Sequence, residues 1–233
     1  MDFQGVTARV AEIRGSIADA VQRGGHGQTV RIVAVTKTHG PEAVLAAAAA
    51  GITDVGENKV QEALGKQEAL TAAGTMPAGM RWHLIGHLQT NKVKALPHFG
   101  LFHAMDRAKL ANEISALGAK LAREIDVLFQ VNVVGEDTKG GYAPSDVAAE
   151  AERLRAMPGL RIRGVMTMAP FDAPESVLRE VFRGARAARD VLRAAGHPAE
   201  ELSMGMSGDY LIAVEEGATM VRLGTVLFGA RGG

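Results

Sequence analysis

The chain of 233 residues contains no cysteine, which excludes disulfides, thiolate metal sites and thiol nucleophiles. This composition fits a reducing cytosol, and we expect a cytoplasmic protein. Lysine plus arginine and aspartate plus glutamate both number 26, so the chain has no formal net charge. Proteins that bind DNA or RNA regardless of sequence have a basic excess, because their affinity comes from neutralising phosphates. We therefore expect no nucleic-acid partner.

Long hydrophobic runs are also missing. The longest apolar stretch, around residues 43–52, is far shorter than the ~20 residues that span a bilayer. Residues 1–14 are polar and mixed in charge, without the apolar core of a secretory signal. We expect no membrane partner. The composition, 47% hydrophobic and 22% charged, is that of an ordinary globular protein.

What the chain does contain is a regular alternation of strand and helix patterns. Val6, Val10, Ile13 and Ile17 recur at steps of three and four, which predicts a leading helix within residues 1–25. Short apolar runs then predict strands at 30–35, 52–55, 82–85, 101–105, 127–134, 160–168, 201–204 and 220–223. Helical patterns follow them at 41–51, 58–70, after Gln89, and at 107–123, 145–157, 174–195 and 208–216. The weakest strands are the short ones at 52–55 and 201–204.

This alternation predicts the fold class. Strands that alternate with helices require a parallel sheet with right-handed crossovers. Eight units within about 200 residues favour a closed (β/α)8 TIM barrel over an open sheet. Because no low-complexity linker interrupts the chain, we expect one domain over 1–233, with the barrel at 30–231 behind the leading helix.

Lys37 is the most informative candidate for chemistry. Active sites of such barrels lie at the C-terminal ends of the strands, and Lys37 directly follows the first strand. A lysine in a barrel mouth is partly desolvated, which lowers its pKa, and a neutral amine is what attacks an aldehyde. On position alone, a solvated lysine that turns outward remains the alternative.

Two glycine-containing turns follow the last two strands, where barrels frequently bind phosphate. The first spans residues 203–209 (SMGMSGD) and offers the Ser207 hydroxyl, and the second contains Gly224 and Thr225. The alternative is that they are ordinary turn glycines with Ser207 as a helix N-cap. A pair of such turns at these two strands favours a phosphate site.

Other polar candidates are weaker. His83 and His87 have no nearby carboxylate that would complete a metal site, so we expect no metal. Met166 and Met168 are expected to pack in the barrel, where a methionine facing an aromatic cofactor would also be compatible. The strand interiors look almost purely apolar, with Asn132 as the exception.

Six blocks of the sequence resemble, in order, the pyridoxal 5′-phosphate (PLP) homeostasis protein family. They are residues 33–38 (VAVTKT), 56–62 (GENKVQE), 82–92 (WHLIGHLQTNK), 164–168 (GVMTM), 202–207 (LSMGMS) and 221–225 (VRLGT). The resemblance implies a fold type III PLP barrel, similar to the N-terminal domain of alanine racemase. It also implies that PLP is the cofactor, held as a Schiff base on Lys37.

The resemblance assigns further residues to the cofactor. Ser207, Gly224 and Thr225 would bind the phosphate, and Arg222 would face the pyridine nitrogen. The same blocks and their flanks place four more residues at the cofactor: Asn58, His83, Met166 and Gly208.

Three positions bear on the family comparison. His39 stands where members often have a second lysine, and the chain ends Arg231-Gly232-Gly233 in place of an Arg-Asp-Tyr-like tail. Lys139 matches a family lysine and is a candidate second amine.

Three functions would use Lys37 and a phosphate site: a PLP carrier or regulator, an amino-acid racemase, and a Schiff-base lyase. Racemisation needs a second base on the opposite face of the cofactor, and the only tyrosines are Tyr142 and Tyr210, neither well placed. A lyase would need carboxylates or a second lysine in the barrel interior. We therefore predict a non-catalytic PLP-binding protein of intracellular PLP homeostasis, with racemase as the alternative. We expect a monomer rather than a dimer, with PLP-dependent apoenzymes as candidate partners.

Overall fold

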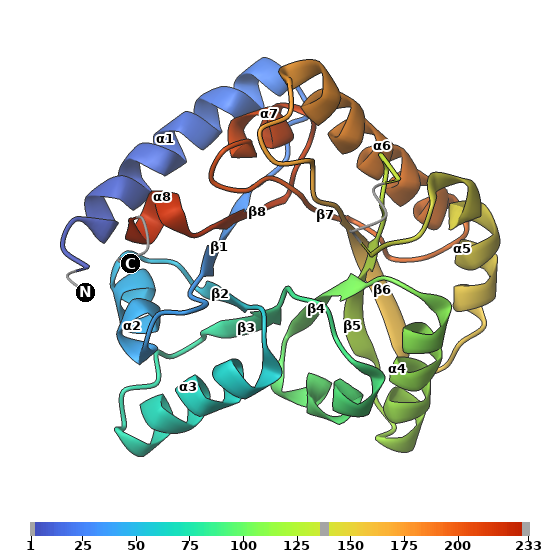
Figure 1. Ribbon diagram of the computed structural model, residues 1–233, viewed down its shortest axis with the longest axis horizontal. Coiled ribbons are helices and arrows are strands. Elements are labelled where there is room, and N and C mark those ends of the chain that lie inside the picture. The colour runs from blue at the N-terminus through green and yellow to red at the C-terminus, as the bar shows by residue number, and fades with distance from the viewer. Residues whose placement is uncertain (1–2, 136–139, 230–233) are drawn as a thin grey trace.

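The computed structural model describes residues 3–135 and 140–229, and these form a closed barrel of parallel strands (Figure 1). The strands run in chain order around the barrel, and β1 closes it by pairing with β8. They are β1 (Arg31–Val35), β2 (Asp54–Glu57), β3 (Arg81–Leu84), β4 (Leu101–Met105), β5 (Ile125–Gln130), β6 (Leu160–Met166), β7 (Glu201–Ser203) and β8 (Met220–Leu223). The predicted (β/α)8 barrel is confirmed.

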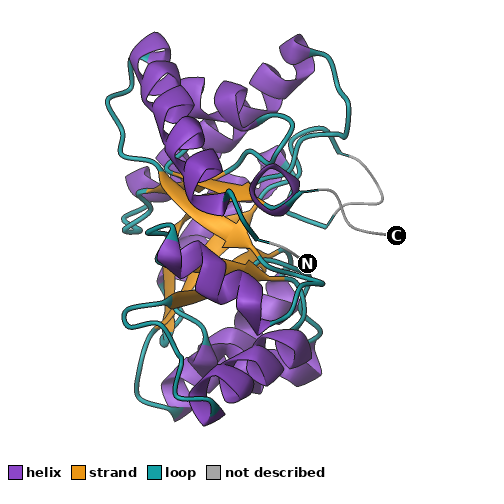
Figure 2. Ribbon diagram, turned by 90° about the vertical axis from the view of Figure 1, so that its left-hand side faces the viewer, coloured by secondary structure: helices purple, strands orange, loops and turns teal. Residues whose placement is uncertain are grey.

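Helices cover the outside of the barrel, so that strands form an inner layer and helices an outer one (Figure 2). They are α1 (Val6–Gly24), α2 (Pro41–Ala49), α3 (Val60–Ala72), η1 (Thr90–His98), α4 (Ala108–Lys120), η2 (Pro144–Asp146), α5 (Val147–Arg155), α6 (Glu175–Ala194), α7 (Tyr210–Glu215) and α8 (Thr225–Phe228), of which η1 and η2 are 3₁₀ helices. None of the helices in the described ranges is both long and apolar enough to cross a membrane.

The leading helix α1 completes the outer layer. Its apolar stripe is buried against α2, α7 and α8, with Val6, Val10, Ile13 and Ile17 facing the protein. Because α8 has only four residues, the last strand has little cover from its own unit. The predicted extra helix therefore replaces the cover that a longer eighth helix would give.

Several strand bounds differ from prediction where polar residues enter the sheet. β2 begins at Asp54, two residues later than expected, and it contains the buried Glu57. β5 ends at Gln130 instead of residue 134. Beyond it, the Asn132 amide donates to the Tyr142 carbonyl and the Tyr142 amide donates to the Gln130 carbonyl, which draws the chain into a loop.

The expectation of apolar strand interiors is wrong. Asn132, the predicted exception, lies outside β5. The strands themselves contain buried polar residues that pair with one another across the barrel or with its helices: Asp54, Glu57, His83, His103, Ser203 and Arg222.

Candidate functional site

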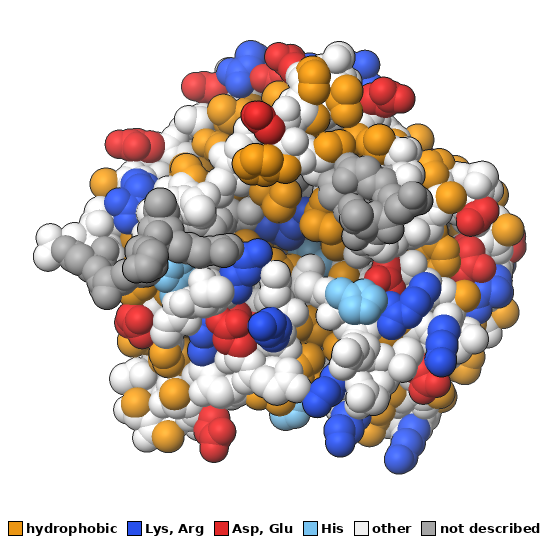
Figure 3. Space-filling view, viewed as in Figure 1, with side chains coloured by type: hydrophobic (Ala, Val, Ile, Leu, Met, Phe, Trp, Pro, Cys, Tyr) orange, Lys and Arg blue, Asp and Glu red, His pale blue; other side chains and the backbone are white. Residues whose placement is uncertain are grey.

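A cavity of about 1010 Å³ opens at the C-terminal ends of the strands. Figure 3 shows a hollow near the centre of this face, with basic side chains inside it. Most of the predicted site residues line this cavity: Lys37, Asn58, Ser207, Gly208, Arg222, Gly224 and Thr225. The C-terminal ends of β1, β2, β7 and β8 therefore bring together residues that are almost 190 positions apart in the sequence.

His83 and Met166, by contrast, are not in the cavity wall. Their side chains are only 2% and 1% exposed, and they are buried in the barrel. His83 lies within β3 and contacts Asp54 and His103, so it lies too deep to reach the cavity. The structure therefore brings seven of the nine predicted cofactor residues together at the cavity, and these two lie outside its lining.

The turn that presents Lys37 is fixed from both sides. Thr38 has a left-handed backbone with φ of 68°, which is costly for a residue other than glycine. Its amide donates to Glu62 Oε1 at 2.5 Å, and Lys66 Nζ donates to the Thr36 carbonyl at 2.7 Å. Two side chains of α3 thus fix the backbone on either side of the half-buried Lys37.

Lys66 also forms a buried ion-pair cluster beside this turn. Its Nζ lies 2.6 Å from Glu57 Oε1 and 2.9 Å from Glu62 Oε1, and the Thr36 hydroxyl donates to Glu57 Oε1 at 2.5 Å. Burial raises the pKa of Glu57, while the hydrogen bond from Lys66 opposes the rise. Sequence reasoning missed this cluster, although the Glu62–Lys66 spacing of four residues is a visible signal.

The two glycine-containing turns meet at Ser207. Its Oγ accepts hydrogen bonds from the Gly224 amide at 3.3 Å and the Val226 amide at 3.4 Å. The residue that precedes α7 is Asp209, so the alternative of Ser207 as an N-cap is wrong. The hydroxyl instead lies among backbone N–H groups of the opposite turn, which is the donor arrangement that an oxyanion prefers.

One glycine in the first turn is dictated by geometry. Gly205 has φ of 92°, and a Cβ at this position would lie 2.6 Å from the Ala213 Cβ. Any larger residue would push the turn away from α7. The glycine therefore keeps the turn, and with it Ser207, close to the barrel.

Arg222 contributes a buried cation to the cavity. From β8 its guanidinium donates to the Ser203 carbonyl and hydroxyl at 2.7 Å each, and to the Thr167 carbonyl at 2.9 Å. Burial lowers the pKa of Arg222 to about 10, against the attraction of Asp209. The side chain therefore remains protonated at neutral pH and acts only as a donor.

Comparison with known proteins identifies the family. The family model for the alanine racemase N-terminal domain matches residues 11–232 of the sequence. The pyridoxal phosphate homeostasis protein of Aquifex aeolicus is 41% identical over 227 residues, which cover 96% of this chain and 97% of that protein. Its namesake from Pseudomonas aeruginosa is 40% identical over 228 residues, or 97% and 96% of the two chains. The chain belongs to the pyridoxal phosphate homeostasis protein family.

Solved structures agree with the family assignment. PipY of Synechococcus elongatus, solved with PLP bound, is 35% identical and superposes with a TM-score of 0.83 over 96% of this chain and 100% of PipY. Alanine racemase of Corynebacterium glutamicum is 16% identical, with a TM-score of 0.71 over 99% of this chain and 62% of the racemase. The second likeness is one of fold alone.

This family member has further polar groups at the cavity that sequence reasoning did not assign. His87 Nδ1 lies 2.8 Å from Asp106 Oδ2, and both residues line the cavity. His39 also lines it and packs against Phe3 and Phe228. Lys139 and the Arg231-Gly232-Gly233 end lie outside the described residues.

Neither tyrosine of this family member lines the cavity. Tyr142 is buried and stacks on Phe129, with ring centroids 4.2 Å apart. Tyr210 begins α7 and packs beside the core. Both positions agree with the prediction that no tyrosine is placed to act as a second base.

Proposed function

We propose that the chain binds PLP in the cavity and acts as a carrier or regulator in intracellular PLP homeostasis, without turnover of its own. The observation that supports this best is the convergence of three unlike groups on one cavity. They are an amine at Lys37, a hydroxyl among amides at Ser207, and a buried cation at Arg222. PLP has one matching feature for each, namely an aldehyde, a phosphate and a pyridine nitrogen.

The residues present fit this ligand. Ser207, Thr225 and the amides near Gly224 would bind the phosphate by charge-assisted hydrogen bonds. Arg222 would donate to the pyridine nitrogen, and Lys37 would take the aldehyde. When bound, PLP supplies an aldehyde that forms a Schiff base with an amine. Asn58 and Gly208 complete the wall, and relatives of this family include PipY with PLP bound.

The geometry favours binding over turnover. A racemase needs a base on each face of the cofactor, and neither tyrosine lines the cavity. Arg222, as an obligatory donor, would leave the pyridine nitrogen unprotonated and the ring a poor electron sink. Of the buried carboxylates, Asp54 and Glu57 do not line the cavity and pair with His83 and Lys66. Asp106 does line it, and its two oxygens pair with His87 and Arg107.

Turnover is directly measurable. We expect the PLP-loaded protein to show no racemase, transaminase or decarboxylase activity with common amino acids, because neither tyrosine lines the cavity and Arg222 would leave the ring a poor electron sink. Exchange of the α-proton in D2O, followed by NMR, checks the first of these reactions. Stereospecific exchange at ~1 s⁻¹ or faster, a rate typical of enzymes, would instead place the protein among the racemases.

The phosphate site can be tested apart from the covalent bond. Hydrogen bonds to charged groups are worth roughly 1.5–3 kcal/mol each. Ser207→Ala is therefore expected to weaken PLP binding by about one to two orders of magnitude. Pyridoxal, which lacks the phosphate, should bind the wild type more weakly and hardly respond to the mutation. Titration of both ligands into both proteins gives the four constants.

Ser145 provides the matched control, since it is exposed and lies outside the cavity. Ser145→Ala should leave both ligands unaffected. If Ser207→Ala weakened PLP and pyridoxal equally, Ser207 would have only a structural role in joining the two turns.

We further propose that PLP-dependent apoenzymes in the cytoplasm receive the cofactor, and that the carrier is a monomer. A cavity that opens on one face of the barrel is accessible to a recipient without dissociation of subunits. Light scattering on the purified protein tests the monomer, and transfer of PLP to an apoenzyme tests the recipient.

A further inference from the structure

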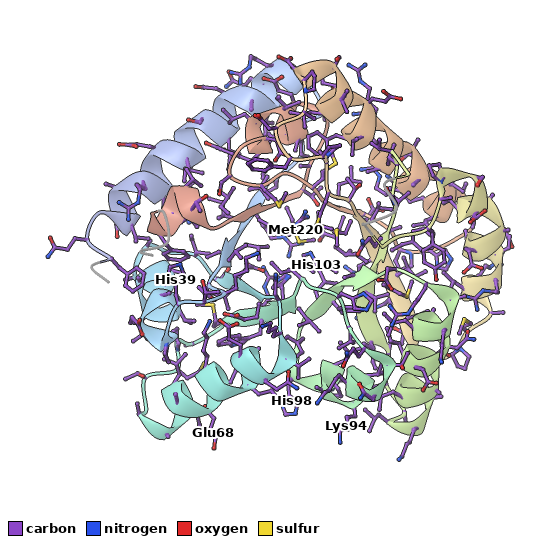
Figure 4. The ribbon with its side chains drawn as sticks, in the orientation of Figure 1. His39, Glu68, Lys94, His98, His103 and Met220 are labelled. Carbon is purple, nitrogen blue, oxygen red and sulfur yellow. The ribbon has the colours of Figure 1, made fainter. Side chains whose placement is uncertain are left out.

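A line of polar side chains crosses the barrel interior beneath the cavity. Arg222 Nη1 lies 2.7 Å from Ser203 Oγ, which lies 2.9 Å from His103 Nδ1. His103 Nε2 lies 2.8 Å from His83 Nδ1, and His83 Nε2 lies 2.9 Å from Asp54 Oδ1. The five residues are buried and come from five different strands. Figure 4 shows His103 near the centre of the barrel.

The chemistry at the two ends sets the direction of these hydrogen bonds. Burial raises the pKa of Asp54, but hydrogen bonds from His83 and Arg81 outweigh it and hold that pKa far below its usual value. Asp54 is therefore a carboxylate that only accepts, so His83 Nε2 must carry a hydrogen. At the other end, Arg222 only donates, so the Ser203 oxygen must accept from it.

The two rings in the middle then have one arrangement. Burial lowers the pKa of both His83 and His103, so each ring is neutral with a single N–H. Because His83 donates from Nε2, its Nδ1 accepts from His103 Nε2. His103 Nδ1 in turn accepts from the Ser203 hydroxyl. Every donor from Arg222 onward points toward Asp54, and no group in the line is left without a partner.

We propose that His83 and His103 are positioning residues that fix Arg222 at the floor of the cavity, through a hydrogen-bond chain anchored on Asp54. The carbonyls of Ser203 and Thr167 hold the guanidinium from the neighbouring strands. The hydrogen-bond chain adds the orientation of the Ser203 hydroxyl, whose hydrogen is directed to His103 Nδ1 so that its lone pairs face Arg222. A change of tautomer at either ring would redirect the hydrogen of that hydroxyl and leave Arg222 and His103 competing as donors to one oxygen.

The hydrogen-bond chain also connects the two ends of the barrel. At the other end, Asp54 forms an ion pair with Arg81, whose side chain is 49% exposed. His83 and Arg81 line a small pocket of about 120 Å³ at the N-terminal ends of the strands. The position of Arg222 in the cavity thus depends on residues at the opposite end of the barrel.

The first test needs no cofactor. In ligand-free protein with ¹⁵N-labelled histidine, NMR is expected to show both His83 and His103 with hydrogen on Nε2 at neutral pH. Asp54→Asn should shift the nitrogen resonances of His103, although Asp54 does not contact it. His98→Gln, at an exposed histidine far from the barrel centre, is the matched control and should leave both rings unchanged (Figure 4). A hydrogen on Nδ1 of either ring, or a doubly protonated ring, would overturn the proposal.

The second test follows the effect at the cavity and rests on the proposed function. Ser203→Ala interrupts the hydrogen-bond chain, whereas Ser203→Thr keeps a hydroxyl at this position. We expect Ser203→Ala to shift the absorption maximum of bound PLP and to weaken its binding roughly two- to tenfold, with recovery in Ser203→Thr. Thermal unfolding of each variant checks that the barrel is intact.

The two ideas fail separately. A protein that has both Nε2–H tautomers but takes up no PLP would refute the proposed function and still support the hydrogen-bond chain. An unchanged PLP spectrum and affinity in folded Ser203→Ala would show that the chain does not position Arg222.

Discussion

Lys37→Ala is expected to abolish the covalent PLP adduct. Purified wild-type protein should be yellow, and borohydride should remove the colour and fix a pyridoxyl group on Lys37, as located by peptide mapping. The variant should keep its fold, because a half-buried lysine at a strand end contributes little packing. The phosphate turns should still bind PLP without a covalent bond, so dialysis should remove it from the variant and not from the wild type.

Lys94→Ala is the matched control for the loss of an amine. Lys94 is exposed, on the 3₁₀ helix η1, far from the barrel centre (Figure 4). This variant should be as yellow as the wild type. A pyridoxyl group mapped to any lysine other than Lys37 in the wild type would contradict the assignment, and a colourless protein that takes up no PLP would end the carrier hypothesis.

Lys66→Met is expected to lower the free energy of unfolding by about 3–5 kcal/mol. The substitution keeps the length of the side chain but removes the cation that pairs with Glu57 and Glu62. Glu57 is fully buried, so its charge would be left without compensation or would have to be neutralised by a proton. Chemical denaturation at neutral pH measures the loss.

Two further variants distinguish a buried charge from lost packing. Lys94→Met removes an exposed amine and should change stability by less than about 0.5 kcal/mol. Glu57→Gln combined with Lys66→Met removes both charges and should recover part of the loss, because a neutral amide needs no counter-ion. If Lys66→Met lowered the free energy of unfolding by less than about 1 kcal/mol, the cluster of Glu57, Glu62 and Lys66 would not have the stabilising role assigned to it.

Local pattern is enough to predict most of the fold. β4 and β8 lie at their predicted bounds, because each is a short run in which a single polar residue stands among apolar ones. β2 runs two residues beyond its predicted end because Glu57 resembles a loop residue, and only their partners make Asp54 and Glu57 compatible with a buried strand. Those partners are His83, on the next strand, and Lys66, on α3, and neither contact is visible in the residues of β2 themselves.

The candidate site was predictable to the extent that its residues follow strand ends. Lys37, Ser207 and Gly224 meet that condition, and all three line the cavity. His83 lies outside the cavity lining, because proximity to a strand end does not reveal depth within the barrel. His103 gave only the signal of a polar residue in an apolar run, since its partner Ser203 is 100 residues away.

The position of α1 has a consequence for synthesis on the ribosome. Its apolar stripe packs mainly on α7 and α8, which follow it by about two hundred residues, a gap that translation at ~5–20 residues per second crosses in roughly 10–40 s. During that interval Val6, Val10 and Ile13 lack most of their final cover and are available to chaperones. Docking of α1 on α7 and α8 and pairing of β1 with β8 must therefore wait until the last strand and helices have been synthesised.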